Sequence, residues 1–430
     1  MMILLYRILY LPGLILGLPY YAFRMWRRGG YRKGFENRFG VMSKVPPKRE
    51  NVKRIWIQAV SVGELLAIIP LLKRLHADPD LEVILTTTTS TGLRLLEERM
   101  AEFTVWHGVF PMDFWLCSSK AWKALQPDTV ILMEGELWPE HIQQAHKRSV
   151  PILLLNARLS DKSFKRHQSV RNLARSYFGK LSSILASSDT DRQRFESLGW
   201  IPRERIISTG NLKFDVELGA ETDSEARDTF VSELGFESAN PFILLGSSTW
   251  PDEESALIET YIGLRQEFSD LRLLIVPRHA ERKGELTEMV KNLPVKVHFR
   301  SEAKQAPTGT EVYIADTTGE LRMITGFADL VIIGKSFPPN VGGQTPVEAA
   351  AMGKAMLFGP DMSNFRDICR NLIREGAAIR IESTEAIQET LRSLLKSSVK
   401  RSQMGAAAAN CINQSRGATE RAVSHIKSAE

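Results

Sequence analysis

Glu64 is an acidic residue one position after a glycine, at the point where a strand gives way to a helix. The segment 54–57, RIWI, is typical of a buried strand, and apolar residues recur at helical spacing between Leu65 and Leu75. Ligands bind beyond the carboxyl ends of the strands in an open α/β sheet, so a carboxylate at this position can act on a substrate. The alternative interpretation is a first-turn glutamate that complements the helix dipole.

Glu134 and Glu136 are a second acidic candidate, because they follow the apolar run TVILM and stand one residue apart. Their side chains would point to opposite faces if the strand continued through them. Paired carboxylates are also the acid and base of many glycosidases.

Two cationic residues follow other strand-like runs. Arg158 either holds an anionic ligand or braces its loop, and Lys213 either acts on a substrate or is a surface lysine beside a linker.

Arg278 is the candidate phosphate ligand of the second half, because its guanidinium fork matches phosphate oxygens. It lies between Pro277 and His279, directly after the run LRLLIV, and a surface salt bridge is the alternative interpretation. Free N–H groups at the start of a helix can hold a phosphate, and a glycine lets the backbone approach a ligand closely. The remaining candidates lie in glycine-containing loops or at expected helix starts that follow other strand-like runs. They are Ser248, Thr318, Gly319, Glu320, Thr345, Pro346, Val347 and Glu348.

Composition bounds the class of protein. A chain of 430 residues exceeds the length at which one hydrophobic core keeps growing, so we expect two domains. The hydrophobic and charged fractions, 43% and 25%, are ordinary for a globular protein. The three cysteines form no C-x-x-C pair, which argues against a disulfide scaffold or a zinc module. The eight histidines form no H-x-x-x-H pair, so we expect no bound metal. We expect no cofactor either.

Strand-like runs alternate with helical runs in each half of the chain, which predicts βαβ units and mostly parallel sheets. An acidic stretch after Asp215 separates the halves. We therefore expect an α/β fold of two Rossmann-like domains, without a G-x-G-x-x-G fingerprint in either. The expected boundaries are a membrane anchor at 1–26, a first domain at 27–215 and a second at 216–430, with the last helix returning toward the first domain.

Residues 8–23 form an apolar segment bounded by Arg7 and Arg24. As a helix it reaches only about 24 Å, short of the roughly 30 Å of the hydrocarbon core. It either spans a bilayer with its flanking arginines snorkelling or lies in the interface, and a buried core helix is the alternative. Basic residues crowd the segment 24–54, and no nucleic-acid motif accompanies them. An anionic membrane surface is the partner that this run favours.

Seven strings occur in order between residues 58 and 354: QAVSVGE, MEGELWP, NARLS, GNLKFD, VPRH, DTTGEL and GGQTPVEAAAMGK. Together they resemble the Kdo transferase family, enzymes that move 3-deoxy-D-manno-oct-2-ulosonic acid (Kdo) from CMP-Kdo to a lipid A precursor in Gram-negative bacteria. The resemblance implies the GT-B fold, in which two Rossmann-like domains face across a cleft. It also implies CMP-Kdo as the donor, lipid IVA as the acceptor, and the cytoplasmic face of the inner membrane as the location.

The resemblance assigns roles to several of the candidates. Glu64 would take the proton from the acceptor hydroxyl in an inverting displacement, and Glu134 would position or stabilise the reacting centre. Lys213 would offset charge on the donor as its bond breaks. Arg278 would hold the phosphate, and Glu348 would accept hydrogen bonds from the ribose hydroxyls.

The chain departs from the family's pattern at four places, one of which is the loop FPPNV before Gly342, which is one residue longer than the family's loop. Gln344 and Thr345 stand where the family has His-Asn, Ala349 where it has proline, and Trp250 where it has histidine. Contacts through the backbone survive such changes. Two other interpretations stay open: another GT-B enzyme that acts on a UDP-sugar as transferase or epimerase, and a non-catalytic lipid-binding member of the family.

Overall fold

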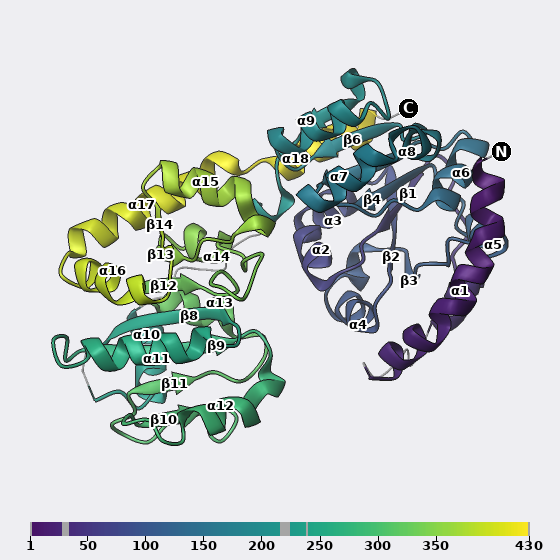
Figure 1. The fold of residues 1–430 in the computed structure, drawn as a ribbon. Helices are drawn as coiled ribbons and strands as arrows, with labels where there is room; N and C mark the ends of the chain where they lie inside the picture. Colours follow the sequence, from purple (N-terminus) through teal and green to yellow (C-terminus); the bar gives the residue numbers. More distant parts are fainter. Residues whose placement is uncertain (1, 28–33, 216–223, 238–239, 429–430) are drawn as a thin grey trace. The chain divides into compact units, whose positions relative to one another are not determined.

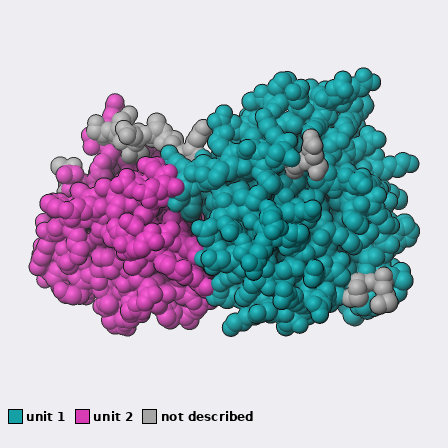
Figure 2. Space-filling model, turned by 90° about the horizontal axis from the view of Figure 1, so that it is seen from above, with its two compact units in different colours: residues 1–217, 415–430 teal, residues 218–414 magenta. Residues whose placement is uncertain are grey.

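The chain folds into two compact units (Figures 1 and 2). The computed structural model describes residues 2–27, 34–215, 224–237 and 240–428. The first unit comprises residues 1–217 and 415–430, and the second comprises residues 218–414. Each unit is built on its own seven-stranded parallel sheet, so the expected pair of doubly wound α/β sheets is confirmed.

The sheet of the first unit has the strand order β3-β2-β1-β4-β5-β6-β7. Its strands are β1 (Lys53–Gln58), β2 (Leu81–Thr87), β3 (Trp106–Val109), β4 (Thr129–Met133), β5 (Ile152–Ala157), β6 (Ser183–Ala186) and β7 (Ile206–Ser208). Its helices are α1 (Met2–Arg27), α2 (Val62–Ala67), α3 (Ile69–His76), α4 (Ser90–Arg99), α5 (Trp115–Leu125), α6 (Pro139–Lys147), α7 (Asp161–Ser169), α8 (Arg171–Phe178), α9 (Asp189–Leu198) and α18 (Ala418–Ser428).

Helices cover both faces of this sheet, which is why its strands are apolar on both sides. Alternate residues of β1 show the two faces. Trp56 packs with residues of α5, α6, α8 and α9. Ile55 and Ile57 pack with residues of α2, α3, α4 and α18. A strand places successive side chains on opposite faces, so one apolar strand serves both cores.

The sheet of the second unit has the order β10-β11-β9-β8-β12-β13-β14. Its strands are β8 (Phe242–Thr249), β9 (Leu271–Pro277), β10 (Val297–Phe299), β11 (Val312–Ile314), β12 (Leu330–Ile333), β13 (Ala355–Phe358) and β14 (Ala378–Arg380). Its helices are α10 (Ser224–Glu233), α11 (Glu253–Leu264), α12 (Lys283–Val290), α13 (Leu321–Phe327), α14 (Val347–Ala351), α15 (Arg366–Arg374), α16 (Glu385–Leu395) and α17 (Ser398–Ser415).

The strand order reverses once in each sheet. In the first unit the chain winds outward from β1 to β3 and then restarts on the other side with β4. In the second unit β8 and β12 are the neighbours at which the direction changes. The loops that follow these two pairs of strands diverge, and this is where open α/β sheets bind their ligands.

Helix α18 belongs to the first unit. Its buried residues Ala418, Ala422 and Ile426 join the apolar cluster that includes α3. The Asp215 carboxylate accepts hydrogen bonds from the backbone N–H groups of Gly417, at 2.7 Å, and Thr419, at 2.5 Å. This carboxylate therefore satisfies free N–H groups at the start of α18.

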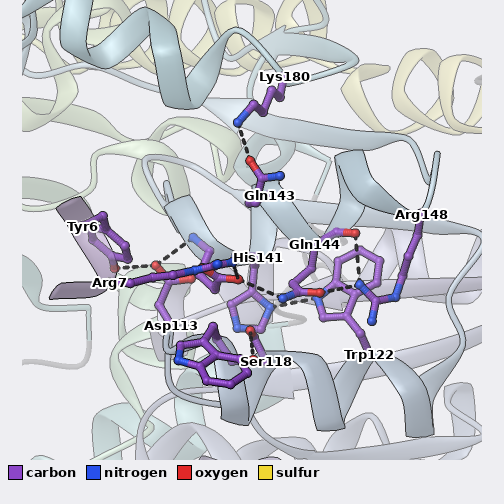
Figure 3. Close-up of polar contacts among 12 residues, drawn as sticks. Tyr6, Arg7, Asp113, Ser118, Trp122, His141, Gln143, Gln144, Arg148 and Lys180 are labelled. Atoms are coloured by element: carbon purple, nitrogen blue, oxygen red, sulfur yellow. Dashed lines mark hydrogen bonds and ion pairs between the residues drawn. The ribbon is translucent and has the colours of Figure 1, made fainter. Parts of the chain in front are cut away.

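Helix α1 docks on the first unit through polar side chains of its first turns (Figure 3). The Tyr6 hydroxyl donates to Asp113 Oδ2 at 2.5 Å. Arg7 donates two hydrogen bonds, both of 2.8 Å, to the carboxylate of Glu140, whose side chain is fully buried. Gln144 Nε2 donates to the same carboxylate at 2.8 Å. These contacts connect α1 to α6 through a charge that is costly to bury without a partner.

The other side of α1 is apolar and open to solvent. Leu4, Ile8, Leu9, Ile15 and Leu16 are exposed, Leu16 by 83%. The alternative of a buried core helix is therefore wrong. None of the helices in the described parts of the chain is long and apolar enough to cross a bilayer. Residues 28–33, which belong to the basic run after α1, lie outside the described residues.

Candidate functional site

Glu64 lies in the first turn of α2, at the carboxyl end of β1. Ser61 is the N-cap of this helix, and its hydroxyl accepts a hydrogen bond from the Glu64 backbone N–H at 3.2 Å. In return the Glu64 carboxylate accepts from the Ser61 hydroxyl, at 2.9 Å, and from the Val60 N–H, at 2.8 Å. The segment SVGE is thus a variant of the capping box, in which the carboxylate accepts from the N–H group one residue before the N-cap, and these contacts fix the rotamer of Glu64.

The pKa of the Glu64 carboxyl group is raised above its usual value. Only 7% of the residue is exposed. Burial raises its pKa, a hydrogen bond from Val60 opposes this, and the negative charge of Glu134 adds to it. The charge of Lys213 opposes the rise. A buried carboxylate with a raised pKa is a better proton acceptor than one in water, so the site suits a general base.

Glu134 follows the last residue of β4 in a left-handed backbone conformation, with φ of 51°. The strand ends at Met133, so Glu134 and Glu136 lie in a turn and the alternation expected for a continuing strand does not apply. Lys213 Nζ forms an ion pair of 2.8 Å with Glu134 Oε1. Non-glycine residues held at positive φ cost energy, and such strain is concentrated at functional sites.

Glu136 also lies within electrostatic reach of the other carboxylates. Burial and the charge of Glu64 raise the pKa of Glu136 to about 7, with a further contribution from Glu134. Three carboxyl groups thus gather at the switch point between β1 and β4, and they do not all ionise readily. Perturbed carboxyl groups beside a fixed cation are typical of sites that transfer protons.

The loops after β5 and β7 complete this cluster. Asn156 is fully buried, and its side chain donates to Glu134 Oε1 at 3.5 Å and accepts from the Leu212 N–H at 3.2 Å. Arg158 Nη1 lies 4.0 Å from Glu134 Oε1. Lys213 itself lies in a short 3-10 helix, Leu212–Phe214, that the Asn211 side chain caps. Arg158 and Lys213 are therefore two cations placed around one carboxylate.

The second unit presents Arg278 at the carboxyl end of β9. Its backbone N–H donates to the Thr249 carbonyl oxygen at 3.0 Å, and the residue is exposed to solvent. No carboxylate of the described residues pairs with its guanidinium group, so the alternative of a surface salt bridge is not formed there. His279, the next residue, contacts the Trp250 ring edge-on, with centroids 5.2 Å apart. Pro277 ends β9, and Ser248 stands in β8 with φ of 54°.

Glu320 is engaged by the protein itself. Arg300 donates two hydrogen bonds to its carboxylate, one of 2.7 Å from Nε, and the Thr317 hydroxyl donates a third. Burial raises the pKa of Glu320, but these hydrogen bonds outweigh it and the net shift is downward. Thr318 and Gly319 form the turn before it, with φ of 91° at Gly319. The turn therefore has a fixed shape, in which backbone groups are available to a ligand.

The segment after β12 leads into the short helix α14. The helix has five residues, Val347–Ala351, preceded by Thr345 and Pro346. The Thr345 hydroxyl accepts from the Val347 N–H at 3.3 Å. Burial raises the pKa of Glu348, although Arg322 lies close enough to oppose this. Within the described residues, no group of three His, Cys, Asp or Glu side chains could hold a metal ion.

The structure brings together Glu64, Glu134, Lys213 and Arg158 in the first unit. The candidates of the second unit lie in the last residues of β8 and β9 or in the loops and the helix start that follow β9, β11 and β12. Sequence reasoning did not single out Glu253 and Lys335, which follow β8 and β12 at the switch point of the second unit. The sequence does contain a signal for Lys335, because this charged residue follows the apolar run LVII and so lies near the carboxyl end of a strand.

Comparison with known proteins gives one consistent result. Residues 33–216 match the family model described as 3-deoxy-D-manno-octulosonic-acid transferase (kdotransferase). The chain is 29% identical to the 3-deoxy-D-manno-octulosonic acid transferase of Haemophilus influenzae over 92% of this chain and 91% of that protein. It is 30% identical to the enzyme of that name from Rickettsia conorii, over 83% of this chain and 75% of that one.

Solved structures share the fold at lower identity. Anabaena Alr3699/HepE, crystallised with UDP-glucose, is 15% identical, with a TM-score of 0.61 over 87% of this chain and 99% of that one. A UDP-GlcNAc 2-epimerase from Neisseria meningitidis is 13% identical, with a TM-score of 0.60 over 86% of this chain and all of that one (100%). These likenesses agree with the GT-B type of fold expected from the sequence.

Proposed function

This chain belongs to the 3-deoxy-D-manno-octulosonic-acid transferase family, and we propose that it transfers Kdo from CMP-Kdo to the lipid A precursor lipid IVA in lipopolysaccharide assembly. The observation that carries the proposal is the cluster at the switch point of the first unit. There a buried glutamate with a raised pKa, Glu64, lies beside the Lys213–Glu134 ion pair. Transfer to a hydroxyl needs a base of this kind.

The reaction is a single displacement at the anomeric carbon of Kdo. Glu64 accepts the proton of the acceptor hydroxyl, whose oxygen forms the new bond to that carbon, and the bond to the CMP phosphate breaks with inversion. The capping box holds Glu64 in one rotamer, so little ordering is needed when the acceptor binds.

Lys213 and Arg278 are the cations that we propose for the donor. Lys213 offsets charge on the donor's carboxylate or phosphate, and Glu134 holds the lysine in place at 2.8 Å. Arg278 is unpaired among the described residues and clamps the phosphate, because a guanidinium group binds phosphate oxygens through two hydrogen bonds. A single phosphate does not need a metal bridge when such donors surround it, so we infer a reaction that is independent of metal.

We further propose that α1 attaches the protein to the cytoplasmic face of the inner membrane. The exposed leucine and isoleucine side chains of α1 would enter the interface, with the polar contacts of Tyr6 and Arg7 holding the helix on the first unit. The basic residues between Arg24 and Arg38 would add attraction to anionic lipids. A lipid acceptor would then meet the site without leaving the membrane.

The test is a direct assay of transfer. The purified full-length protein is incubated with CMP-Kdo and a tetraacylated lipid A precursor, and the products are weighed by mass spectrometry. We expect lipid products heavier by one or more Kdo units, and their mass gives the number added. Parallel reactions with UDP-glucose and UDP-GlcNAc serve as controls. Turnover of a UDP-sugar without any turnover of CMP-Kdo would refute the proposal.

A further inference from the structure

Lys335 and Trp250 form a cation–π pair at the switch point of the second unit. Trp250 follows the end of β8 and Lys335 lies two residues after β12, and these strands are neighbours in the sheet. Lys335 Nζ lies 4.6 Å from the centroid of the Trp250 ring. Because ligands of open α/β sheets bind beyond this pair of strands, the lysine stands where a donor would be held.

Glu253 fixes both members of this pair at once. Its Oε2 atom accepts hydrogen bonds from the backbone N–H groups of Trp250, at 2.9 Å, and Lys335, at 2.8 Å. Its Oε1 atom accepts from those of Ser336, at 2.9 Å, and Phe337, at 3.2 Å. Only 4% of Glu253 is exposed. A buried carboxylate that ties two loops together through four N–H groups makes the positions of lysine and tryptophan interdependent.

The backbone of Lys335 is held in an unusual conformation. Its φ is 59°, which favours glycine, yet a long charged side chain occupies the position. Its carbonyl oxygen accepts from the Gly343 N–H at 2.9 Å, so it also contacts the loop that leads into α14. The left-handed conformation turns the chain sharply after β12 while the neighbouring loops hold it from both sides.

The charge of Lys335 has no counterpart in the described part of the chain. No carboxylate of those residues forms an ion pair with its ammonium group, and the same holds for the Arg278 guanidinium group after the adjacent strand pair β8–β9. Cations that have no carboxylate partner and are held on fixed loops are available to an anionic ligand. A sugar acid linked to a nucleoside monophosphate carries two anionic groups, a phosphodiester and a carboxylate.

We propose that Lys335 binds an anionic group of the nucleotide-sugar donor, and that Trp250 is a positioning residue that holds the lysine ammonium group in place. This inference rests on the proposed function, since it takes the donor to be a nucleotide-linked sugar acid. Arg278 and Lys335 then share the two charges of that donor. Trp250 contacts Lys335 on its ring face and His279 in a T-shaped ring contact, so it spaces the loops that carry the charged residues.

The test measures the binding of CMP and of CMP-Kdo by calorimetry. Lys335→Met keeps the stem of the side chain and removes the charge, and we expect binding to weaken about tenfold or more, as for a lost charged hydrogen bond. Lys335→Arg should restore most of the affinity. Lys400→Met removes an exposed lysine of α17 whose ammonium group forms no ion pair with the described residues, and it should change nothing. Thermal unfolding of each variant checks that it is folded.

The two nucleotides identify which anion Lys335 binds. Equal weakening for CMP and CMP-Kdo assigns it to the phosphate, and weakening for CMP-Kdo alone assigns it to the carboxylate. Trp250→Ala should weaken binding only while Lys335 is present, so its effect should largely vanish in the Lys335→Met background, whereas Trp250→Phe should retain most of the affinity. A purely structural tryptophan would weaken binding equally in both backgrounds.

Two outcomes overturn the inference in different ways. If the parent protein binds both nucleotides and a folded Lys335→Met variant binds them equally well, the inference is wrong and the proposed function stands. If the parent protein binds neither nucleotide, the proposed function fails and takes this inference with it.

Discussion

The substitution Glu64→Gln separates the catalytic interpretation of this residue from the structural one. Glutamine has nearly the same shape and can keep both contacts of the side chain. Its carbonyl oxygen can accept from the Val60 N–H, now at 2.8 Å, and its NH₂ group can donate to the Ser61 hydroxyl, now at 2.9 Å. The fold should therefore be retained, whereas the amide cannot accept the acceptor's proton.

The expected magnitudes differ enough to decide between the two interpretations. Loss of a general base costs about 10²- to 10⁴-fold in turnover, and a factor of 10² is about 2.7 kcal/mol of activation free energy. Loss of an N-cap costs about 1 kcal/mol of stability, or about 2–4 °C in melting temperature. Glu64→Gln should therefore lower turnover by about 10²-fold or more while the melting temperature changes little.

Ser61→Ala is the matched control, because it removes the cap and leaves the carboxylate. We expect it to lower the melting temperature while turnover falls by about tenfold at most, the cost of one hydrogen bond to the base. The assay is the initial rate of Kdo transfer at saturating CMP-Kdo, with calorimetric melting curves of the same samples. Near-normal turnover in Glu64→Gln, or an equal loss of turnover in Ser61→Ala, would refute the role of Glu64 as the base.

Four further predictions follow from the charged groups. Since the pKa of Glu136 is raised to about 7, this group stabilises the fold fully below pH 4.5 and loses that contribution as the pH rises through about 7. Glu136→Gln should remove this contribution to the pH dependence of stability, as measured by denaturant unfolding. An unchanged pH dependence in the variant would contradict the raised pKa. Arg278→Ala should weaken CMP binding by about 1.5–3 kcal/mol, as for a lost charged hydrogen bond, and calorimetry that finds equal affinity would move the phosphate site elsewhere. Transfer should persist in EDTA, and a loss that magnesium or manganese restores would show a metal-dependent reaction. Deletion of residues 1–23 removes Arg7 and leaves the buried Glu140 carboxylate without its cation, which should lower the free energy of unfolding by about 3 kcal/mol. Glu140→Gln in the truncated protein should restore most of that stability. Vesicle binding by the truncated protein should become sensitive to salt, and salt-resistant binding would show that α1 is not the anchor.

The amino-acid sequence by itself determined the elements and the location of the first catalytic candidate. Runs such as RIWI and TVILM read as buried strands because a parallel sheet covered on both faces requires apolar side chains on both sides. The placement of Glu64 also follows from local pattern, since a capping box is contained within four residues. Both patterns depend only on residues that are close together in the sequence, so they can be recognised from a single sequence.

Only the tertiary structure decided which side chains meet. Glu134 and Lys213 are 79 positions apart, and their ion pair exists because strand order places the loops after β4 and β7 around one end of the sheet. The end of β4 at Met133 and the left-handed turn at Glu134 were not visible in a run of apolar residues. The pairing of Lys335 with Trp250 likewise depends on the adjacency of β8 and β12. Hydrophobic periodicity specifies each strand, but contacts between loops are set by the order and register in which the strands assemble.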